Sequence, residues 1–398
     1  SISGAWRISE EDFFNVDFVD ELKVRAGYGT TGNSAIGNYA SRGLFSVSGS
    51  YRGSSGITPN QLANGLLGWE TASEINIGVD YELFDGRVFG SFDVYRKQND
   101  DLLFTQPLPS SSGFGGITSN IGKIENRGLE VEFNSINIST RDFSWSTRVN
   151  FSLSSNEILD LPYGEDISAG SQFSSLRIGK PIGLIQVARW AGVNPADGRP
   201  MWYDVDGNII FQNVNGANDV EYKDGHAEFV GGYGTTLSYK GLSVDAFFQF
   251  SFGQWAFAQT SFYFTRTPDF LMNLNTEVLD RWKQPGDITY YPRAMQGGAD
   301  YPETDNYRVT ESTQGIYNAS YIRLKNLNVT YDIPSRFTDA IGIRGASIYA
   351  AGVNLFTWTA WPWYDPEVAD NSTDIFGNYT RASYPTEKSV YGGIRLQF

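Results

Sequence analysis

The stretch that most constrains the fold is the last one, because it ends on an aromatic residue with no polar tail. In Val390–Phe398, one face of an extended strand carries Val390, Ile394, Leu396 and Phe398. Free chain ends are usually solvated and frayed, so a soluble domain seldom ends in this way. The last strand of a membrane barrel does, because its edge must pair inside the bilayer. This stretch favours a barrel and leaves a soluble sandwich open as the alternative.

Alternation of apolar and polar residues recurs along the chain between turn signals. In residues 74–83 the apolar positions are Ile75, Ile77, Val79, Tyr81 and Leu83. The turn Phe84-Asp85-Gly86-Arg87 follows at once and is typical of a tight hairpin. Such strands are longer than the five or six residues that are typical of soluble proteins. A sandwich turns its apolar face to a core and a membrane barrel turns it to lipid, so alternation alone does not separate the two.

The lengths of the connections between strands distinguish a membrane barrel from a soluble sandwich. Short connections are predicted near 84–87, 135–141, 240–241 and 334–343, and long ones near 29–68, 105–117, 156–227, 259–316 and 359–384. Short and long largely alternate, as do the periplasmic turns and extracellular loops of outer-membrane barrels, and unstructured loops of this length are uncommon in soluble domains. We therefore predict an all-β chain, with residues 1–398 forming one part of an antiparallel transmembrane β-barrel. The loops near 29–68, 156–227, 259–316 and 359–384 are predicted to be extracellular.

The pattern gives roughly eleven wall strands, of which the first is clipped at Ser1–Ile8. If the C-terminus is periplasmic, the strand at 142–154 runs outward and the strand at 228–240 runs inward. An even number of strands, none or two, must therefore lie between them. Residues 176–211 could supply a wall hairpin or a folded extracellular excursion, and their glycines and prolines favour the excursion. An odd number of strands does not close by itself into a bacterial barrel, which has an even number.

Composition limits the chemistry. The 398 residues include no Cys and one His, with a formal charge of -15 and a mean hydropathy of -0.32. There is no disulfide framework or thiolate metal site, the acidic balance disfavours nucleic acid, and no apolar run is long enough for a membrane helix. The chain starts on Ser1 without a signal peptide, so an export signal was removed or the start lies upstream. A catalytic triad would depend on His226 alone, so we predict no enzyme, although a barrel hydrolase is a third hypothesis.

A set of motifs in a fixed order resembles the C-terminal half of SusC/RagA-like TonB-dependent outer-membrane transporters of Bacteroidetes. The motifs are Ala5–Glu11, Leu22–Gly29 with Thr31–Asn33, Asn120–Glu130, Ile178–Gly183, Tyr321–Leu327, Asp365–Glu367 and Phe398. The resemblance implies about eleven strands of a larger, probably 22-stranded barrel that imports an oligosaccharide or a peptide. The plug, the TonB-contacting segment and the first half of the barrel do not occur in this sequence. The chain is then a fragment, or the missing half is a separate chain.

The resemblance also implies partners and a location. The partners are an N-terminal barrel-and-plug portion, TonB acting through that portion, a SusD-like surface lipoprotein and outer-membrane lipid, but no nucleic acid. The location is the bacterial outer membrane, with the loops at the cell surface. The terminal Phe398 would be the signal that the barrel-insertion machinery recognises. The alternative function is that of a soluble all-β carbohydrate-binding or structural protein.

Candidate substrate-binding residues lie in the last long loop, namely Trp361, Trp363, Tyr364, Asp365 and Glu367. Aromatic faces beside carboxylates suit sugars, although barrels also carry aromatic girdles at the membrane interface. Trp255 and Phe262–Phe264 could likewise bind sugar or belong to an aromatic girdle. No metal or other cofactor is predicted; calcium in the outer loops stays open at Asp204–Asn208 and at Asp365, Glu367, Asp370 and Asp374. At these positions a β-turn and a solvated loop are the favoured interpretations.

Overall fold

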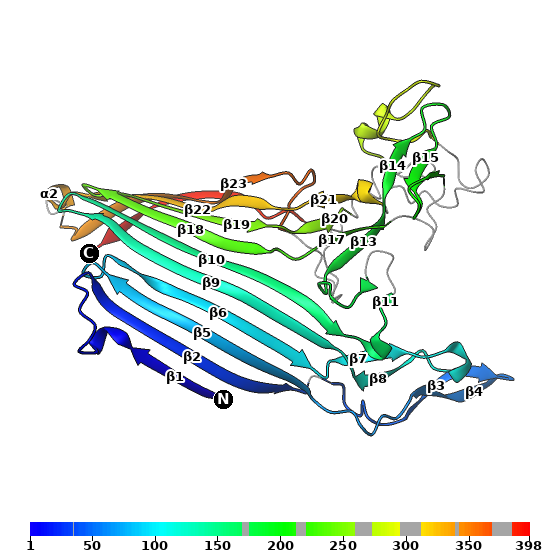
Figure 1. The fold of residues 1–398 in the computed structure, drawn as a ribbon. Coiled ribbons are helices and arrows are strands. Elements are labelled where there is room, and N and C mark those ends of the chain that lie inside the picture. The colour runs from blue at the N-terminus through cyan, green and yellow to red at the C-terminus, as the bar shows by residue number, and fades with distance from the viewer. Residues whose placement is uncertain are drawn as a thin grey trace. The chain divides into compact units, whose positions relative to one another are not determined.

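The computed structural model describes residues 1–34, 36–168, 175–211, 220–258, 273–294, 312–338, 342–367 and 384–398. Its largest sheet is antiparallel and, within these residues, has eleven strands, joined side by side in chain order (Figure 1). The strands are β1 (Ile2–Arg7), β2 (Val19–Asn33), β5 (Glu70–Leu83), β6 (Val88–Asp100), β9 (Lys123–Ser139), β10 (Phe143–Asp160), β18 (Phe229–Tyr239), β19 (Leu242–Phe252), β22 (Tyr321–Ile333), β23 (Gly345–Thr359) and β24 (Ser389–Gln397). The predicted number of wall strands is confirmed.

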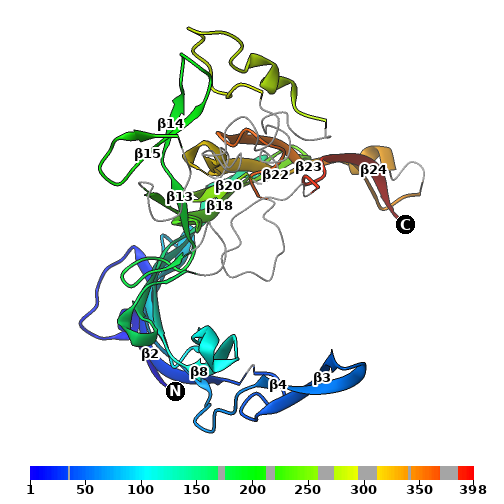
Figure 2. The same cartoon turned by 90° about the vertical axis from the view of Figure 1, so that its right-hand side faces the viewer.

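Smaller sheets occupy the connections. They pair β3 (Leu44–Tyr51) with β4 (Ser54–Gln61), β7 (Leu103–Pro107) with β8 (Gly116–Asn120), β11 (Ile167–Ser168) with β12 (Ser175–Leu176), β13 (Leu184–Ala188) with β17 (Val220–Asp224), β20 (Trp255–Phe257) with β21 (Ile316–Asn318), and β14 (Trp190–Val193) with β15 (Pro200–Tyr203) and β16 (Ile209–Ile210). Since β10 pairs directly with β18 in the large sheet, residues 176–211 lie outside the wall, as predicted, while their extracellular location stays a prediction. The strand β2 runs on to Asn33, so the connection predicted from position 29 starts later. The β3–β4 hairpin extends away from β2 and β5 (Figures 1 and 2).

Helical segments are short. They are 3-10 turns at Ile8–Glu10, Ser110–Ser112, Pro162–Gly164, Thr276–Asp280 and Thr313–Gly315, and α2 (Ser335–Thr338). In the part of the chain that the structure describes, no helix has the length and apolar character needed to cross a membrane.

The chain divides into two compact units. The first comprises Ser1–Phe133, Ser152–Ile167 and Leu176–Ile182, and the second comprises Asn134–Phe151, Ser168–Ser175 and Gly183–Phe398. Strands β9 and β10 contribute to both units.

Two predicted tight turns are confirmed by the backbone. Between β5 and β6, Phe84, Asp85 and Gly86 all have positive φ angles, of 59°, 56° and 72°. Between β18 and β19, Lys240 and Gly241 have φ angles of 46° and 89°. Positive φ at both central residues defines the hairpin turn whose twist matches that of the flanking strands.

The wall of the first unit has one apolar and one charged face. On the apolar face Ile77 stands opposite Val94, and its side chain is 53% exposed. On the other face, Arg25 donates to Asp80 (3.0 Å) and to Asp93 (2.6 Å). Gly78 lies between these charges, where a Cβ atom would stand 2.5 Å from an Asp93 oxygen and 2.7 Å from the Arg25 guanidinium carbon. The apolar side chains are thus the exposed ones, the reverse of a soluble sheet.

The wall of the second unit follows the same rule. Phe248 stands opposite Tyr233 on β18 and Leu324 on β22, and its ring lies 6.4 Å from that of Trp358. The next residue, Gln249, is on the other face, where its side-chain amide donates to the hydroxyl of Tyr321 (3.2 Å). The alternation predicted from the sequence therefore separates the two faces of this wall as well.

Among the described residues, the buried apolar clusters lie in the connections rather than along the wall. One combines Ile185, Val187, Phe257 and Ile316, another joins Ala188 to Trp202, and a third combines Ala258, Ala319 and Trp361. Where no such core of described residues packs against it, an apolar wall face needs other apolar surroundings. Lipid provides these for membrane barrels.

Candidate functional site

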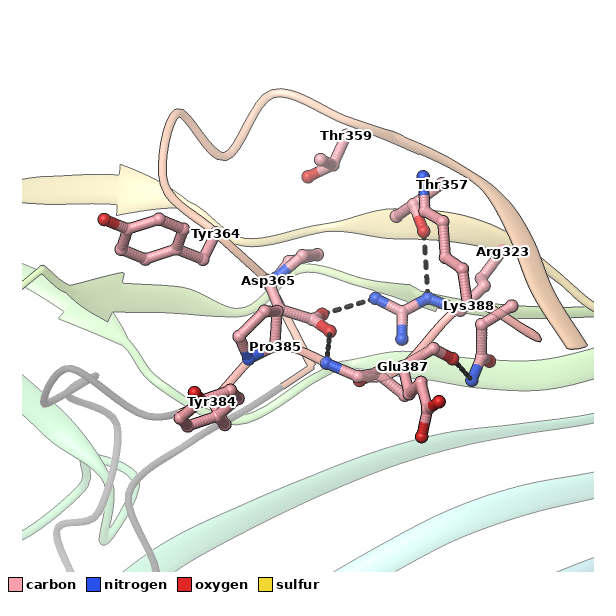
Figure 3. Close-up of a pocket in the computed structure, with 12 residues that line it drawn as sticks. Arg323, Thr357, Thr359, Tyr364, Asp365, Tyr384, Pro385, Glu387 and Lys388 are labelled. Carbon is pink, nitrogen blue, oxygen red and sulfur yellow. Dashed lines mark hydrogen bonds and ion pairs between the residues drawn. The ribbon is translucent and has the colours of Figure 1, made fainter.

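The best-defined polar site lies where the loop after β23 meets the wall strand β22. Its centre is Arg323, which is 2% exposed. The guanidinium donates to a carboxylate oxygen of Asp365 and to the hydroxyl of Thr357 (3.0 Å) (Figure 3). It also donates to Glu367 (2.6 Å). A buried charge is costly unless it is paired and hydrogen-bonded, and here each guanidinium nitrogen has a partner.

Asp365 joins both ends of this loop to the wall. Besides Arg323, it accepts hydrogen bonds from the backbone amides of Glu367 (3.0 Å) and Thr386 (2.8 Å). Burial alone would raise the pKa of Asp365, but the hydrogen bonds from Arg323 and Thr386 outweigh it and the pKa is lowered. The carboxylate is therefore ionised at neutral pH. Together with Lys325, which donates to Glu367 at 2.7 Å, these groups form what we call the Arg323 clamp: Arg323, Lys325, Asp365 and Glu367.

A cavity of about 630 Å³ lies beside the clamp. It is lined by Arg323, Asn354, Thr357, Thr359, Tyr364, Asp365, Pro366, Tyr384, Pro385, Thr386, Glu387 and Lys388 (Figure 3). Tyr364 and Tyr384 are 72% and 94% exposed. The carboxylate of Glu387 and the ammonium of Lys388 are also exposed, and neither has a partner among the described residues. The cavity thus combines a rigid charged base with free aromatic and charged groups.

A bulge shapes the base of this cavity. The pairing of β22 with β23 shifts between Leu324 and Asn326, and Asn354 has a φ angle of 53°. Asparagine tolerates this left-handed conformation better than most residues. Its side-chain amide donates to the backbone carbonyl of Glu387 (3.0 Å), which fixes the loop end beside β23, while its buried Oδ1 has no hydrogen-bond partner within the described chain.

The structure separates the residues predicted for substrate binding. Trp361 is buried with Ala258 and Ala319, and its ring meets that of Tyr317 edge-on at 5.9 Å. Trp363 packs against the same cluster, and Glu367 is part of the clamp. Tyr364 and Asp365 line the cavity. Their binding of a substrate stays a prediction.

Other predicted positions are placed as follows. Trp255 packs against the cluster of Ile185 and Val187, with the Lys223 ammonium 4.4 Å from its ring. Phe262–Phe264, Asp370 and Asp374 lie outside the described residues. The terminal Phe398 is 79% exposed just beyond β24, and its role as an assembly signal stays a prediction.

The segment Asp204–Asn208 forms the turn that the sequence favours. The Asp204 carboxylate accepts from the backbone amides of Asp206 (3.0 Å) and Asn208 (2.7 Å), and Gly207 has a φ angle of 83°. The described residues hold no group of three or more side chains with the make-up of a metal site. The prediction of no metal, with calcium in the outer loops left open, stays a prediction.

Sequence reasoning missed Arg323, Tyr384, Glu387 and Lys388 as site residues. Arg323 had a usable signal, because it is a cation between the apolar Ile322 and Leu324 of a wall strand. Its carboxylate partner lies 42 positions away, and no spacing rule connects the two.

The chain matches the family model described as TonB dependent receptor-like, beta-barrel, over residues 5–355. It belongs to this family. TonB-dependent receptor P3 of Formosa agariphila is 32% identical over 99% of this chain, and TonB-dependent receptor SusC of Bacteroides thetaiotaomicron is 28% identical over 100% of it. This chain covers 41% and 40% of those two proteins.

Solved structures agree with this assignment. The RagAB peptide transporter superimposes with a TM-score of 0.83 at 28% identity, over 100% of this chain and 43% of that chain. The RagAB peptide importer in the open-open state gives a TM-score of 0.84 over 42% of its chain. The chain thus spans about two-fifths of the length of its relatives, and the TonB-dependent receptor family and barrel fold predicted from its motifs are confirmed.

Proposed function

We propose that this TonB-dependent receptor chain is part of an outer-membrane importer for nutrients too large to diffuse through pores. The match to the barrel family over residues 5–355 carries the proposal. The wall supports it, because exposed apolar side chains such as Ile77 suit lipid and paired charges such as Arg25 and Asp93 suit an aqueous lumen. Its relatives are named receptors and transporters, which favours transport over catalysis.

The proposed partners are an N-terminal barrel-and-plug portion, TonB acting through that portion, and a SusD-like surface lipoprotein. Exposed backbone edges are costly in lipid, so further wall strands should pair with those described here. The β3–β4 hairpin supports a contact with the lipoprotein, because Phe45, Val47 and Ile57 are exposed in the loop predicted near 29–68. Apolar side chains gathered in this way often mark protein interfaces.

Uptake by whole cells tests the import function. A strain that lacks the gene should lose uptake of labelled oligosaccharides or peptides, and the intact gene should restore it. Disruption of tonB should abolish the same uptake. Equal uptake with and without the gene, for both substrate classes, would contradict the proposal.

Purification tests the location and the partners. The protein should fractionate with outer membranes and should require detergent. After purification in mild detergent, mass spectrometry should find a barrel-and-plug portion and a SusD-like surface lipoprotein together with this chain. Purification as a monodisperse species without detergent would instead support a soluble all-β carbohydrate-binding or structural protein.

A further inference from the structure

We propose that the cavity beside the Arg323 clamp is a glycan-binding subsite, in which Tyr364 and Tyr384 stack on sugar rings and Glu387 and Lys388 hydrogen-bond to hydroxyls. This proposal rests on the proposed import function and specifies the substrate class as an uncharged oligosaccharide. The volume of about 630 Å³ lies within the range of about 300–1,000 Å³ that is usual for small-molecule sites.

The aromatic groups suit sugar rings. Tyr364 and Tyr384 line the cavity with rings that are largely free of protein contacts, and Pro385 adds a further apolar surface (Figure 3). The C–H faces of a sugar can pack on such rings while its hydroxyls remain available for hydrogen bonds. A tyrosine loses few rotamers when it binds, so these rings provide contact area at low entropic cost.

The polar groups favour an uncharged ligand. The Arg323 guanidinium is already bonded to Asp365, Glu367 and Thr357, so it is not available to an acidic ligand. Among the described residues, the lining charges without a partner are the neighbouring Glu387 and Lys388, one of each sign. A carboxylate accepts from sugar hydroxyls and an ammonium donates to them, and the pair leaves no net charge to select an ion.

The backbone disfavours a peptide in the same place. Peptides that bind to a sheet usually add a strand to a regular free edge. At this level of β23 the left-handed Asn354 belongs to a bulge, where the pairing with β22 shifts, and its side-chain amide already donates to the carbonyl of Glu387. The edge beside the cavity is therefore irregular.

The clamp holds the binding groups in place. Tyr364 adjoins Asp365, and Tyr384 lies two residues before Thr386, whose amide bonds to Asp365. Both rings are thus attached to backbone fixed to β22. A site ordered before binding loses less entropy when it takes up its ligand.

Calorimetry on the complete detergent-solubilised protein tests this proposal. The probes are maltohexaose, cellohexaose, xylohexaose and inulin oligosaccharides, with a tryptic digest of casein as the peptide probe. We expect wild-type protein to bind one of the glycans. The double variant Tyr364→Ala/Tyr384→Ala should weaken that binding about tenfold or more, which corresponds to about 1.4 kcal/mol. The double variant with Phe at both positions keeps the ring faces and should bind like wild type.

Tyr39→Ala is the matched control, because Tyr39 is 72% exposed, as Tyr364 is, but is remote from the cavity in sequence and lies in the other unit. It should leave glycan binding unchanged. The proposal is overturned if wild-type protein binds none of the glycans, if the Ala variants bind them as wild type does, or if the casein peptides bind instead and are lost in the Ala variants. In the last two cases uptake by wild-type cells can still succeed, so failure of this subsite is distinguishable from failure of the import function.

Discussion

Replacing Asp365 with asparagine should loosen both ends of the loop after β23. In the wild-type protein this carboxylate pairs with Arg323 and accepts from the amides of Glu367 and Thr386. Asparagine has nearly the same shape but carries no charge. The substitution therefore leaves Glu367 as the remaining anionic partner of a guanidinium that is almost fully buried.

The expected magnitude follows from this burial. Removing one partner of a buried ion pair costs about 3–5 kcal/mol, because the other charge stays in a dry site. Glu367 keeps its contact with Arg323 at 2.6 Å, so we expect the lower end of that range. Since 1.36 kcal/mol is a factor of ten, amide exchange at the loop ends should be about 100-fold faster.

Hydrogen exchange measured by mass spectrometry checks this value in detergent. Peptides that cover 360–367 and 384–388 should lose protection in Asp365→Asn, whereas peptides from β18 and β19 should not. The matched control is Asp245→Asn, which breaks the half-exposed pair with Arg148 (3.2 Å). Such a pair contributes about 0–1 kcal/mol, so the control should change exchange by a factor of about five or less.

A double substitution sharpens the test. Replacing both charges, as in Arg323→Met with Asp365→Asn, should disturb the loop ends less than Asp365→Asn alone, because the asparagine oxygen can still accept from the Thr386 amide and no under-paired guanidinium is left buried. Unchanged protection of 384–388 in Asp365→Asn would show that the carboxylate does not hold the loop. Equal effects of Asp365→Asn and Asp245→Asn would refute the argument from burial.

Three further predictions follow from the pKa of Asp365 and from the register of the wall. Because the pKa of Asp365 is lowered, its contribution to stability should be complete above the usual aspartate value of about 3.9 and should disappear as the pH falls through the lowered pKa. Hydrogen exchange between pH 7 and 3, corrected for intrinsic rates, measures this contribution. Loss of protection at the loop ends already near pH 6 would contradict the prediction. Phe248→Glu should reduce the yield of heat-modifiable barrel, at a cost below the about 2–4 kcal/mol of Arg or Lys on the lipid face, whereas Gln249→Glu lies on the other face, opposite Arg323 in the register, and should be tolerated; equal yields would disprove this register. Deleting Leu396–Phe398 should abolish assembly in the same assay, because it removes the pairing of Leu396 and Gln397 with Ala346 and Gly345, and wild-type amounts of folded barrel would refute it.

The wall could be predicted because apolar and polar residues alternate along its strands and so mark the two faces of the sheet. Ile75 and Ile77 alternate with polar neighbours, and the pair Lys240-Gly241 marks a turn with two positive φ angles. The β3–β4 hairpin was hidden in a predicted loop, because its alternation is short and Gly49 and Gly53 interrupt it. The bulge at Asn354 was also hidden, since many sequences can accommodate an extra residue in a strand.

The site was only partly predictable. The aromatic run after β23 pointed to the right loop, but only the structure shows that Trp361 is buried while Tyr364 lines the cavity. The partner of Arg323 was hidden among 45 acidic residues, because the register of β22 against β23 and the return of the chain at Thr386 decide which carboxylate reaches it. Such long-range pairing is set by tertiary structure and leaves no local pattern.

The bond between Asp365 and Thr386 has a consequence for how such receptors can diversify. It closes the 20 intervening residues into a loop whose two ends stay fixed to one wall strand. Doubling the length of a flexible loop costs only about 0.6 kcal/mol in closure entropy. Insertions and deletions between these two positions therefore leave the register of β22, β23 and β24 untouched. We therefore expect members of this family to differ in the length and sequence of this segment while they share the same membrane wall.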